Sequence, residues 1–423
     1  MILANDCTYD TVLGLKQSST YSAANGSPRT EVYGYDSNFD YLTGATYNDG
    51  LANGSPTWTY DAGGNRTDSV CDNLNRTTSI SGTSTTCDSL GNRTALGSTT
   101  TYAWDCLNRM TSFTNSTGTM SYQYRADGMR TRKSTTSGFT EYYHDGQMPM
   151  EDAVVSGTSL TATRYGLGAR GIDYEEVATG TYTNGTTRTV GSYSNVGFPI
   201  YDAHGNMTAT LARSNSGYQV NNQRSYDAWG AIRQGTATAD PKNRYCASLG
   251  HQQDDESGLI YMRARYYEPG SGRFVSQDPV ADGLNWFTYA NCDPVDQTDV
   301  TGKRGEAFQI GDFWVAFDRF YDDGAGRMAD YNWGFTDACK GGAIRFDGQI
   351  KHGADAPEAL KALLQGNKKF QKWLGRCTEH TGRSAGIGMT SLDTAFMADP
   401  MFVIGLFDDI GQGFHMFANL QNN

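Results

Sequence analysis

The sequence predicts a mainly β protein built from antiparallel β-hairpins, with a smaller α+β or α-rich region at its C-terminal end. Composition is the first observation behind this prediction. Among 423 residues, 50 are glycine, 26 are tyrosine and only 19% are charged. Tyrosine and threonine favour strands, whereas glycine and asparagine favour tight turns. An aromatic content of 12% is too high for a disordered polar chain.

A short repeated unit is the second observation. An aromatic residue or a cysteine is followed by aspartate, by a turn with glycine or asparagine, and often by arginine or methionine with threonine. Clear copies begin at Tyr60, Cys71, Cys87, Trp104, Tyr201 and Tyr226. Weaker copies lie at residues 33–44 and 122–132, where Arg125 takes the place of the aspartate. Such self-similarity is the signature of a repeat architecture.

Each unit has the chemistry of a β-hairpin. Alternation such as Tyr122-Gln123-Tyr124 directs aromatic rings to one face of a strand. The aspartate can accept hydrogen bonds from turn amides, and glycine or asparagine takes the positive φ that reverses the chain. One hairpin cannot bury its aromatic face alone, but stacked neighbours can. We therefore interpret the repeat aspartates as turn formers and not as catalytic residues.

The repeated unit resembles the YD repeat of Rhs proteins, of the TcC subunits of insecticidal toxin complexes and of teneurins. The resemblance spans roughly residues 30–240, with a less regular stretch at 150–195. It implies one long β-sheet that spirals into a hollow shell. We assign residues 1–242 to this shell segment, which is one end of a longer shell or a small incomplete one.

Residues 243–303 resemble the Rhs repeat-associated core domain along their whole length. The matching pieces are SGLIYMRARYYEPGSGRF (257–274), SQDP (276–279), GLNWFTYAN (283–291) and DVTGK (299–303). In that family the core closes the shell and cuts its own backbone with two aspartates. The resemblance places these at Asp278 and Asp299 and the cut after Lys303, and Arg273 and Arg265 are candidate supporting cations.

The chemistry of a carboxylate pair suits such a cut, since one ionised group can activate water while a protonated one polarises the carbonyl. Two positions depart from the family pattern: Val300 stands where proline is usual, and Lys303 where leucine is usual. The alternative is that Asp278 and Asp299 only cap turns in a plug that does not cut. The aromatic residues of this segment are expected to pack in a core; they are Tyr261, Tyr266, Tyr267, Phe274, Trp286, Phe287 and Tyr289.

The composition changes after Lys303, and residues 304–423 form a variable tail that the resemblance implies is often a toxin. We expect a strand or an aromatic-rich core at 308–320 and a helix at 356–376. An apolar stretch at 395–419 is interrupted by proline, glycine and aspartate, which indicates a buried, partner-covered or membrane-active segment. Glu379 and His380 are a candidate acid/base pair, although an exposed loop is the favoured interpretation of these two residues.

Charge and cysteine spacing exclude several classes of protein. A net charge of −12 makes the shell a poor partner for nucleic acid, and no apolar run approaches the ~18 residues of a membrane span. No CxxC pair is present among the eight cysteines, so we expect no zinc site and no cofactor. Cys71 and Cys87 are interpreted as small buried substitutes for tyrosine and not as a disulfide.

Two functions remain open at this point. The first is a bacterial polymorphic toxin or delivery shell that encloses its own tail and releases it by autoproteolysis; secretion machinery and an immunity protein are its expected partners. The second is a non-catalytic surface or adhesion scaffold with a partner-binding tail. We expect a secreted or cell-surface protein without a recognisable signal peptide, with residence in the cytoplasm before export as an alternative.

Overall fold

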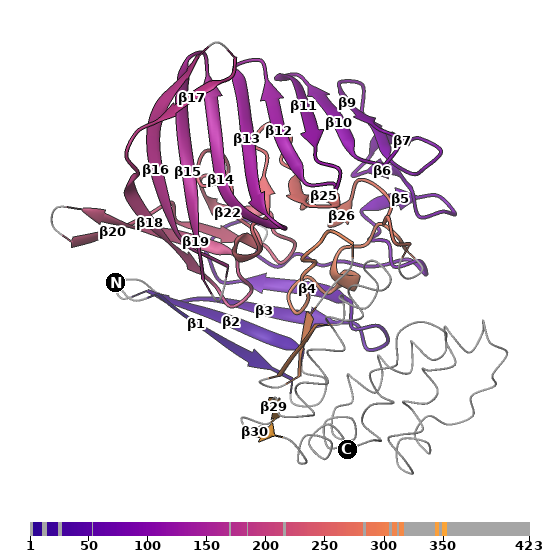
Figure 1. Cartoon of the computed structure of the whole chain (residues 1–423). Coiled ribbons are helices and arrows are strands. Elements are labelled where there is room, and N and C mark those ends of the chain that lie inside the picture. The colour runs from indigo at the N-terminus through magenta and orange to yellow at the C-terminus, as the bar shows by residue number, and fades with distance from the viewer. Residues whose placement is uncertain are drawn as a thin grey trace, which may run out of the picture. The chain divides into compact units, whose positions relative to one another are not determined.

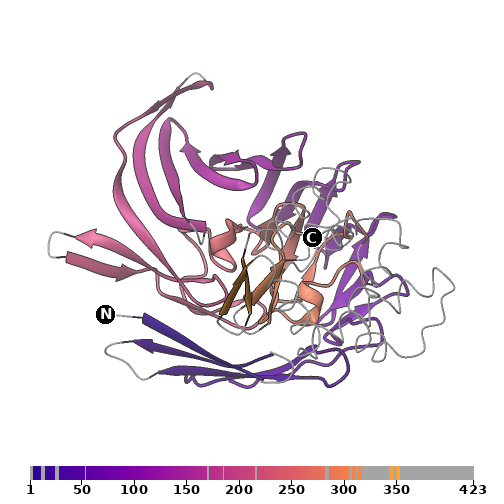
Figure 2. The same ribbon diagram turned by 60° about the horizontal axis from the view of Figure 1, so that its bottom comes forward.

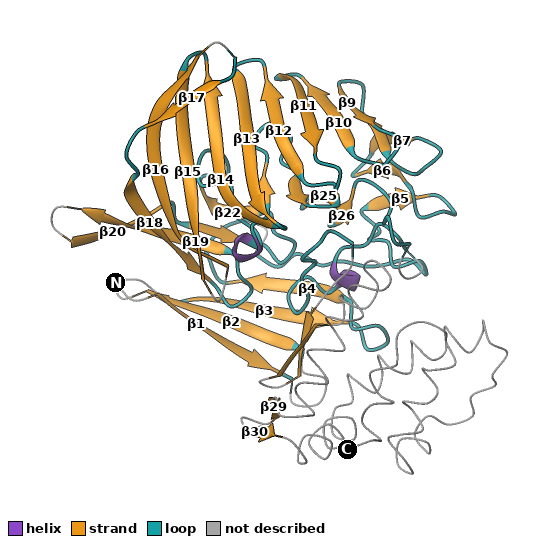
Figure 3. Cartoon of the chain, viewed as in Figure 1, coloured by secondary structure: helices purple, strands orange, loops and turns teal. Residues whose placement is uncertain are grey.

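The computed structural model describes residues 3–303, apart from 11–14, 24–27, 53, 169–170, 184, 215–216 and 282–284, and four short strands beyond them. Residues 1–7 and 18–305 form one compact unit, and residues 8–17 and 306–423 form another. The described part is almost entirely β, as Figure 3 shows. Its helical segments are single 3-10 turns, η1 (Ala247–Leu249) and η2 (Ala290–Cys292). The predicted mainly β, antiparallel fold class is confirmed.

A sheet of sixteen strands, β5 to β20, makes up most of the first unit (Figure 1). Strands that follow one another in sequence are neighbours in the sheet, except that β17 pairs only with β16. The strands are β5 (Ser69–Cys71), β6 (Thr77–Ile80), β7 (Thr83–Cys87), β8 (Arg93–Leu96), β9 (Thr100–Trp104), β10 (Met110–Asn115), β11 (Gly118–Tyr124), β12 (Arg130–Thr135), β13 (Gly138–Asp145), β14 (Met148–Ser156), β15 (Ser159–Gly168), β16 (Gly171–Thr183), β17 (Thr187–Val190), β18 (Ser194–Tyr201), β19 (Met207–Ser214) and β20 (Gly217–Asn221).

Smaller sheets account for the remaining strands. A four-stranded sheet contains β1 (Leu3–Tyr9), β2 (Lys16–Ala23), β3 (Arg29–Tyr35) and β4 (Leu42–Tyr47). A hairpin pairs β21 (Arg224–Tyr226) with β22 (Ile232–Gly235), and a second four-stranded sheet contains β23 (Gln252–Gln253), β24 (Ile260–Met262), β25 (Arg265–Glu268) and β26 (Arg273–Phe274).

Two hairpins are described in the tail. One pairs β27 (Ala307–Ile310) with β28 (Phe313–Ala316), and the other pairs β29 (Ala343–Phe346) with β30 (Gln349–His352). The first hairpin agrees with the strand alternative for residues 308–320 where that range is described. The expected helix at 356–376 and the apolar stretch at 395–419 lie outside the described residues.

The repeat aspartates form the turns of the large sheet. Asp88 Oδ1 accepts hydrogen bonds from the amides of Leu90 and Asn92, each at 2.9 Å. Gly91, between them, has φ of +78°, which glycine adopts without steric cost. The same two side-chain bonds, to amides two and four residues further on, recur at Asp61, Asp72, Asp105, Asp202 and Asp227. The interpretation of these aspartates as turn formers is confirmed.

The aromatic residue of a repeat ties its strand to an earlier one. The hydroxyl of Tyr124 donates to the carbonyl of Met110 at 2.7 Å, and the indole N–H of Trp104 donates to the carbonyl of Arg93 at 2.7 Å. At Cys87 the thiol takes this place, 3.8 Å from the carbonyl of Thr77. The described cysteines are free thiols, and Cys71 and Cys87 are half-buried, as substitutes for tyrosine would be.

The stretch at 150–195, where the repeat pattern is irregular, contains the longest strands of the sheet. β15 has 10 residues and β16 has 13, and they pair in register from Ser159↔Thr181 to Gly168↔Gly171 with one bulge. The sheet is therefore continuous through a region that lacks the YD signature, since backbone pairing does not depend on the turn sequence.

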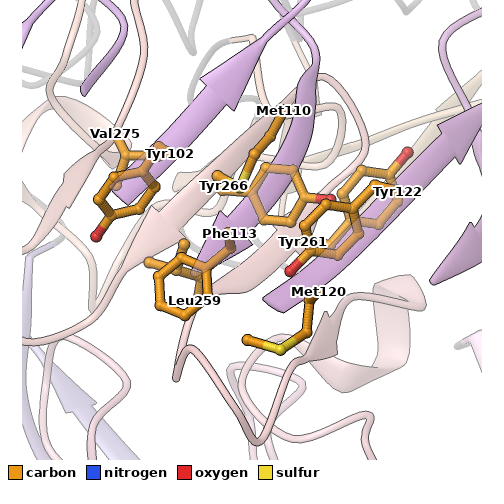
Figure 4. Packing of buried hydrophobic residues seen from close by; sticks show 9 residues of the cluster. All are labelled: Tyr102, Met110, Phe113, Met120, Tyr122, Leu259, Tyr261, Tyr266 and Val275. Carbon is orange, nitrogen blue, oxygen red and sulfur yellow. The ribbon is translucent and has the colours of Figure 1, made fainter. Parts of the chain in front are cut away.

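Residues 243–303 lie on the concave side of the large sheet (Figures 1 and 2). Figure 4 shows how the two parts share a core, in which residues from β9 to β11 meet residues from β24, β25 and their neighbours. The buried cluster contains Tyr102, Met110, Phe113, Met120, Tyr122, Leu259, Tyr261, Tyr266 and Val275. The expected core packing of the aromatic residues is confirmed for six of seven, but Trp286 is 37% exposed because it lies in a surface loop.

Buried ion pairs join the same two parts. Arg130 Nη1 of β12 lies 2.8 Å from Asp254 Oδ2, and both side chains are almost fully buried. Lys133 Nζ lies 3.2 Å from the other oxygen of Asp254. Arg93 of β8 forms a bidentate ion pair with Glu268, in which Nη1 and Nη2 donate to Oε1 and Oε2 at 2.8 and 3.1 Å. Paired arginines hold the pKa of Asp254 and of Glu268 below their ordinary values against the opposing effect of burial.

Candidate functional site

Arg265 occupies the centre of the predicted site. It begins β25, after a two-residue turn that pairs Met262 with Arg265. Its side chain is buried, and the guanidinium carbon lies 3.6 Å from the centre of the Phe274 ring. A guanidinium stacked on a ring keeps its in-plane N–H groups available as donors. Arg265 can therefore present several N–H groups to acceptors around its edge.

Asp278 is held in a tight turn after β26. Its Oδ1 accepts a hydrogen bond from the amide of Val280 at 2.9 Å, and its own amide donates to the carbonyl of Trp286 at 2.9 Å. The side chain is 5% exposed, and its Oδ2 lies 3.8 Å from Arg265 Nη2. Asp278 is thus fixed in position with one carboxylate oxygen turned toward the guanidinium.

Asp299 approaches the same guanidinium from the other end of the core segment. Its Oδ2 lies 3.3 Å from Arg265 Nη2. Its Oδ1 accepts hydrogen bonds from the amides of Gly302 and Lys303, at 2.7 and 3.0 Å. Asp299 is fully buried, and its three donors stabilise a charged carboxylate. The turn that Asp299 closes ends at Lys303, beside the expected cut.

One guanidinium nitrogen therefore faces both predicted aspartates. A cation in this place offsets part of the repulsion between two buried carboxylates. Arg265 is the cation that the structure brings to the pair.

Arg273, the other candidate cation, is placed elsewhere. Its guanidinium donates to Asn65 Oδ1 and to the carbonyl of Asn75, the latter at 2.6 Å. These acceptors belong to the repeat turns before and after β5. Burial lowers the pKa of Arg273, and its contacts join the core to the large sheet.

The chain between the second aspartate and the expected cut is held by its carbonyls. The carbonyl of Val300 accepts hydrogen bonds from Arg263 Nη1 and from His251 Nε2, the latter at 3.1 Å. The amide of Ala264 donates to the carbonyl of Thr301 at 3.1 Å, and Arg265 Nε donates to the carbonyl of Gly302. Three consecutive carbonyls are thus fixed.

Gly302 is required by this close packing. It has φ of +72°, and a Cβ at this position would lie 1.9 Å from the carbonyl oxygen of Met262. No other residue fits without a shift of the backbone. The glycine of the DVTGK motif therefore lets residues 299–303 lie directly against the β24–β25 hairpin.

The role of Arg263, which lies within the 257–274 motif, and that of His251, which lies before it, were not predicted. Arg263 alternates with Arg265 in YMRARYY, which is a signal that both arginines lie near one site. His251 precedes a short strand and carries no motif of its own. Glu379 and His380 of the tail lie outside the described residues.

The described residues contain neither a candidate metal site nor a candidate membrane-spanning helix. No group of three or more histidine, cysteine, aspartate or glutamate side chains there could hold a metal ion. In the same part of the chain, no helix has the length and apolar character that a membrane span requires.

Comparison with known proteins gives several partial matches, although no family model matches the chain. The tRNA3(Ser)-specific nuclease WapA of Bacillus spizizenii is 32% identical over 213 residues, which cover 48% of this chain and 8% of that protein. Toxin protein Tse5 of Pseudomonas aeruginosa is 34% identical over 101 residues, which cover 22% of this chain and 8% of that protein. The chain thus spans less than a tenth of the length of these relatives.

One further relative and one solved structure are similar over parts of the chain. The double-stranded DNA deaminase toxin A of Burkholderia cenocepacia is 33% identical over 95 residues, covering 22% of this chain and 6% of that protein. The crystal structure of TcdB2-TccC3 has a TM-score of 0.46 at 18% identity, with 70% of this chain and 16% of that chain covered.

Proposed function

We propose that this chain, a relative of the Rhs/YD-repeat proteins, is part of a toxin-delivery shell that cuts its own backbone after Lys303. Asp278 and Asp299 would be the catalytic residues, with Arg265 as the cation between them. Residues 304–423 would be the released effector, and residues 1–242 and 243–303 the shell segment and the core. The relatives named as toxins or nucleases support a toxin role.

The observation that carries the proposal is the position of Arg265. It faces carboxylate oxygens of Asp278 and Asp299 at 3.8 and 3.3 Å, within a buried segment that ends beside the expected cut. Two carboxylates of a purely structural turn pair have no need to converge on one cation. Burial also strengthens each electrostatic contact in the site.

The reaction would be a hydrolysis. Water adds to the carbonyl carbon of Lys303 and loses a proton to a carboxylate, and the bond from that carbon to the nitrogen of Arg304 breaks. The nitrogen takes up the proton that the aspartate accepted from water, and the second proton of the water passes from the new carboxyl group to the amine, so the products are a carboxylate on Lys303 and an ammonium group on Arg304. The fixed carbonyls of residues 300–302 would hold the chain in a reactive geometry, which can replace much of the entropic cost of the step.

A second candidate function is the non-catalytic scaffold. Asp278 Oδ1 accepts the Val280 amide and Asp299 Oδ1 accepts the Gly302 amide, as turn-capping aspartates do. Val300 and Lys303, which depart from the family pattern, also favour this alternative. In this case the tail would dock on a partner and would remain attached to the shell.

Asparagine variants distinguish the two functions. Asp278→Asn and Asp299→Asn keep the shape and the turn hydrogen bonds but cannot act as carboxylates, so each should reduce the cut at least a hundredfold. The measurement is the fraction of cut chain on a denaturing gel over time after synthesis.

Asp105→Asn is the matched control. Asp105 makes the same pair of turn hydrogen bonds in a repeat but lies in the β9–β10 turn, so the control should cut at the wild-type rate. Variants of Asp278 and Asp299 that cut as fast as this control would remove both residues from the mechanism.

A further inference from the structure

The carbonyl of Val300, in the segment that precedes the expected cut, accepts hydrogen bonds from two side chains. Arg263 Nη1 and His251 Nε2 both donate to it. Neither residue contacts the aspartate pair in the hydrogen bonds described above. Their shared target lies one residue after Asp299, so they hold the backbone next to one of the two proposed catalytic residues.

His251 can act here only as a neutral donor. A carbonyl oxygen accepts but does not donate, so Nε2 must carry the proton in this contact. Burial, together with the charge of Arg263, lowers the pKa of His251 to about 3. The ring therefore remains uncharged at ordinary pH and does not serve as an acid or base.

Arg263 has a second set of contacts, with the wall of the shell. Its Nε donates to the carbonyl of Gln147 at 3.3 Å, and its Nη2 donates to the carbonyl of Leu249 at 2.7 Å. Gln147 lies in the turn between β13 and β14 of the large sheet. One side chain thus joins this hairpin, the loop before β23 and the segment that ends at Lys303.

The backbone at these positions is built for close contact. Arg263 has φ of +62°. Glycine adopts this left-handed conformation without steric cost, whereas a residue with a side chain is strained there. Gly250, next to His251, has φ of +83°, and a Cβ there would lie 2.6 Å from Cδ of Pro149 in β14. The hairpin therefore packs directly on the loop that carries the histidine.

We propose that Arg263 and His251 are positioning residues for the cut, and that Arg263 makes this positioning depend on the docking of the β13–β14 hairpin. The inference rests on the proposed function and adds regulation to it. The chain would be cut only after the shell wall has closed over the core. Premature release of the tail from a partly folded shell would then be prevented.

Glycine and glutamine variants separate positioning from stability. Arg263→Gly removes the side-chain contacts with Val300, Gln147 and Leu249 but relieves the strained backbone, so it should slow the cut at least tenfold with a smaller loss of thermal stability than a buried arginine usually causes. His251→Gln keeps an N–H donor and should cut within about threefold of wild type, with an unchanged pH profile. His251→Leu has no donor and should cut at least tenfold more slowly.

Ser81→Gly is the control, because Ser81 also has a positive φ, of +46°, in a turn of the large sheet that does not reach the site. It should cut at the wild-type rate. Each rate is measured by pulse-labelled synthesis of the full chain followed by denaturing gels, with the melting temperature of each purified variant as the measure of folding.

The dependence on hairpin docking has its own test. Gly250→Ala pushes Pro149 away without changing a residue of the site, so it should slow the cut, and Pro149→Ala in the same chain should restore part of the rate.

Arg263→Gly and His251→Leu variants that fold and cut as fast as wild type would overturn the positioning role alone. Gly250→Ala with the wild-type rate would overturn the coupling. An uncut wild type would overturn the proposed function, and this inference with it.

Discussion

Asp152 of β14 is a buried carboxylate that forms no ion pair with any of the described residues. Its Oδ2 accepts hydrogen bonds from the Tyr165 hydroxyl at 2.7 Å and from Gln252 Nε2. Its Oδ1 has no hydrogen-bond partner among the described residues. Burial raises the pKa of Asp152 to about 6, although the two hydrogen bonds oppose this. Gln252 belongs to the segment 243–303, so the Asp152 carboxyl lies where the large sheet contacts that segment.

This raised pKa predicts a pH dependence of stability. The folded state holds a proton that the unfolded state releases above pH ~4, so stability is lost as the pH rises through about 6. Asp152→Asn cannot ionise. The free energy of unfolding of the variant relative to wild type should therefore rise by on the order of 2 kcal/mol between pH 4 and pH 7.5.

Chemical unfolding at several pH values measures this difference. Asp105→Asn is a control for which we expect the opposite pH dependence of stability. The Asp105 carboxylate accepts hydrogen bonds from Arg109 and from turn amides, and these lower its pKa despite some burial. Its variant should lose stability relative to wild type as the pH rises from 3 to 6. A pH-independent difference for Asp152→Asn would show that this carboxyl is ionised in the folded state.

The residues of the candidate site could be predicted only in part. Asp278, Asp299 and Arg265 were found because they lie in motifs, but sequence alone left Arg265 and Arg273 equivalent. Their different partners depend on which turns of the sheet lie opposite β25 and β26, and that pairing spans about 200 residues for Arg273 and Asn65. No local pattern contains such information.

At the scale of elements, the hairpin turn is a unit with one constant position. The third residue after the aspartate has a positive φ in each clear repeat, as glycine at 64, 91, 205 and 230 and as asparagine at 75 and 108. The turn chemistry was predictable because aspartate, glycine and asparagine act locally. The lengths of β14 to β16 were not, since long strands there depend on pairing and not on turns.

Two glycine variants test the turn geometry. Gly128 has φ of +89° with open space around a Cβ, so Gly128→Ala should cost only the backbone strain of about 1–2 kcal/mol. Gly230 has φ of +90°, and a Cβ there would lie 2.5 Å from the buried ring of Tyr245. Gly230→Ala should therefore lower the melting temperature clearly more than Gly128→Ala.

Thermal unfolding of the full chain gives both values, with Ser81→Gly as a control. Ser81 is exposed and has φ of +46°, which glycine also accepts, so its replacement should change the melting temperature least. Equal losses for the two alanine variants would mean that the turn at Gly230 is free to move away from Tyr245.

At the scale of the whole molecule, the large sheet and the core stabilise one another. The core supplies Asp254 and Glu268 as partners for Arg130 and Arg93 of the sheet, and both parts share the aromatic cluster of Figure 4. A buried charge without its partner is costly, so neither part is expected to fold well without the other. We therefore expect the proposed cut after Lys303 to follow the folding of both parts.

The resemblance to the Rhs/YD-repeat proteins was predictable from sequence because its motifs are long and ordered, and the toxin relatives that match parts of the chain agree with it. The tail was not predictable in the same way. Residues 304–423 carry no such motif, and the only described elements there are two short hairpins. Our proposal about the tail is therefore limited to the cut that would release it.

The intact mass of the purified wild-type chain under denaturing conditions tests this cut most directly. We expect two pieces, residues 1–303 and 304–423, and the fraction of cut chain should grow at the same rate at every protein concentration, because the proposed cut is intramolecular. Lys303→Leu should increase that rate, since it restores the apolar residue usual before the cut. A single intact mass for both wild type and Lys303→Leu would contradict the account and would leave Asp278 and Asp299 as turn residues of a scaffold.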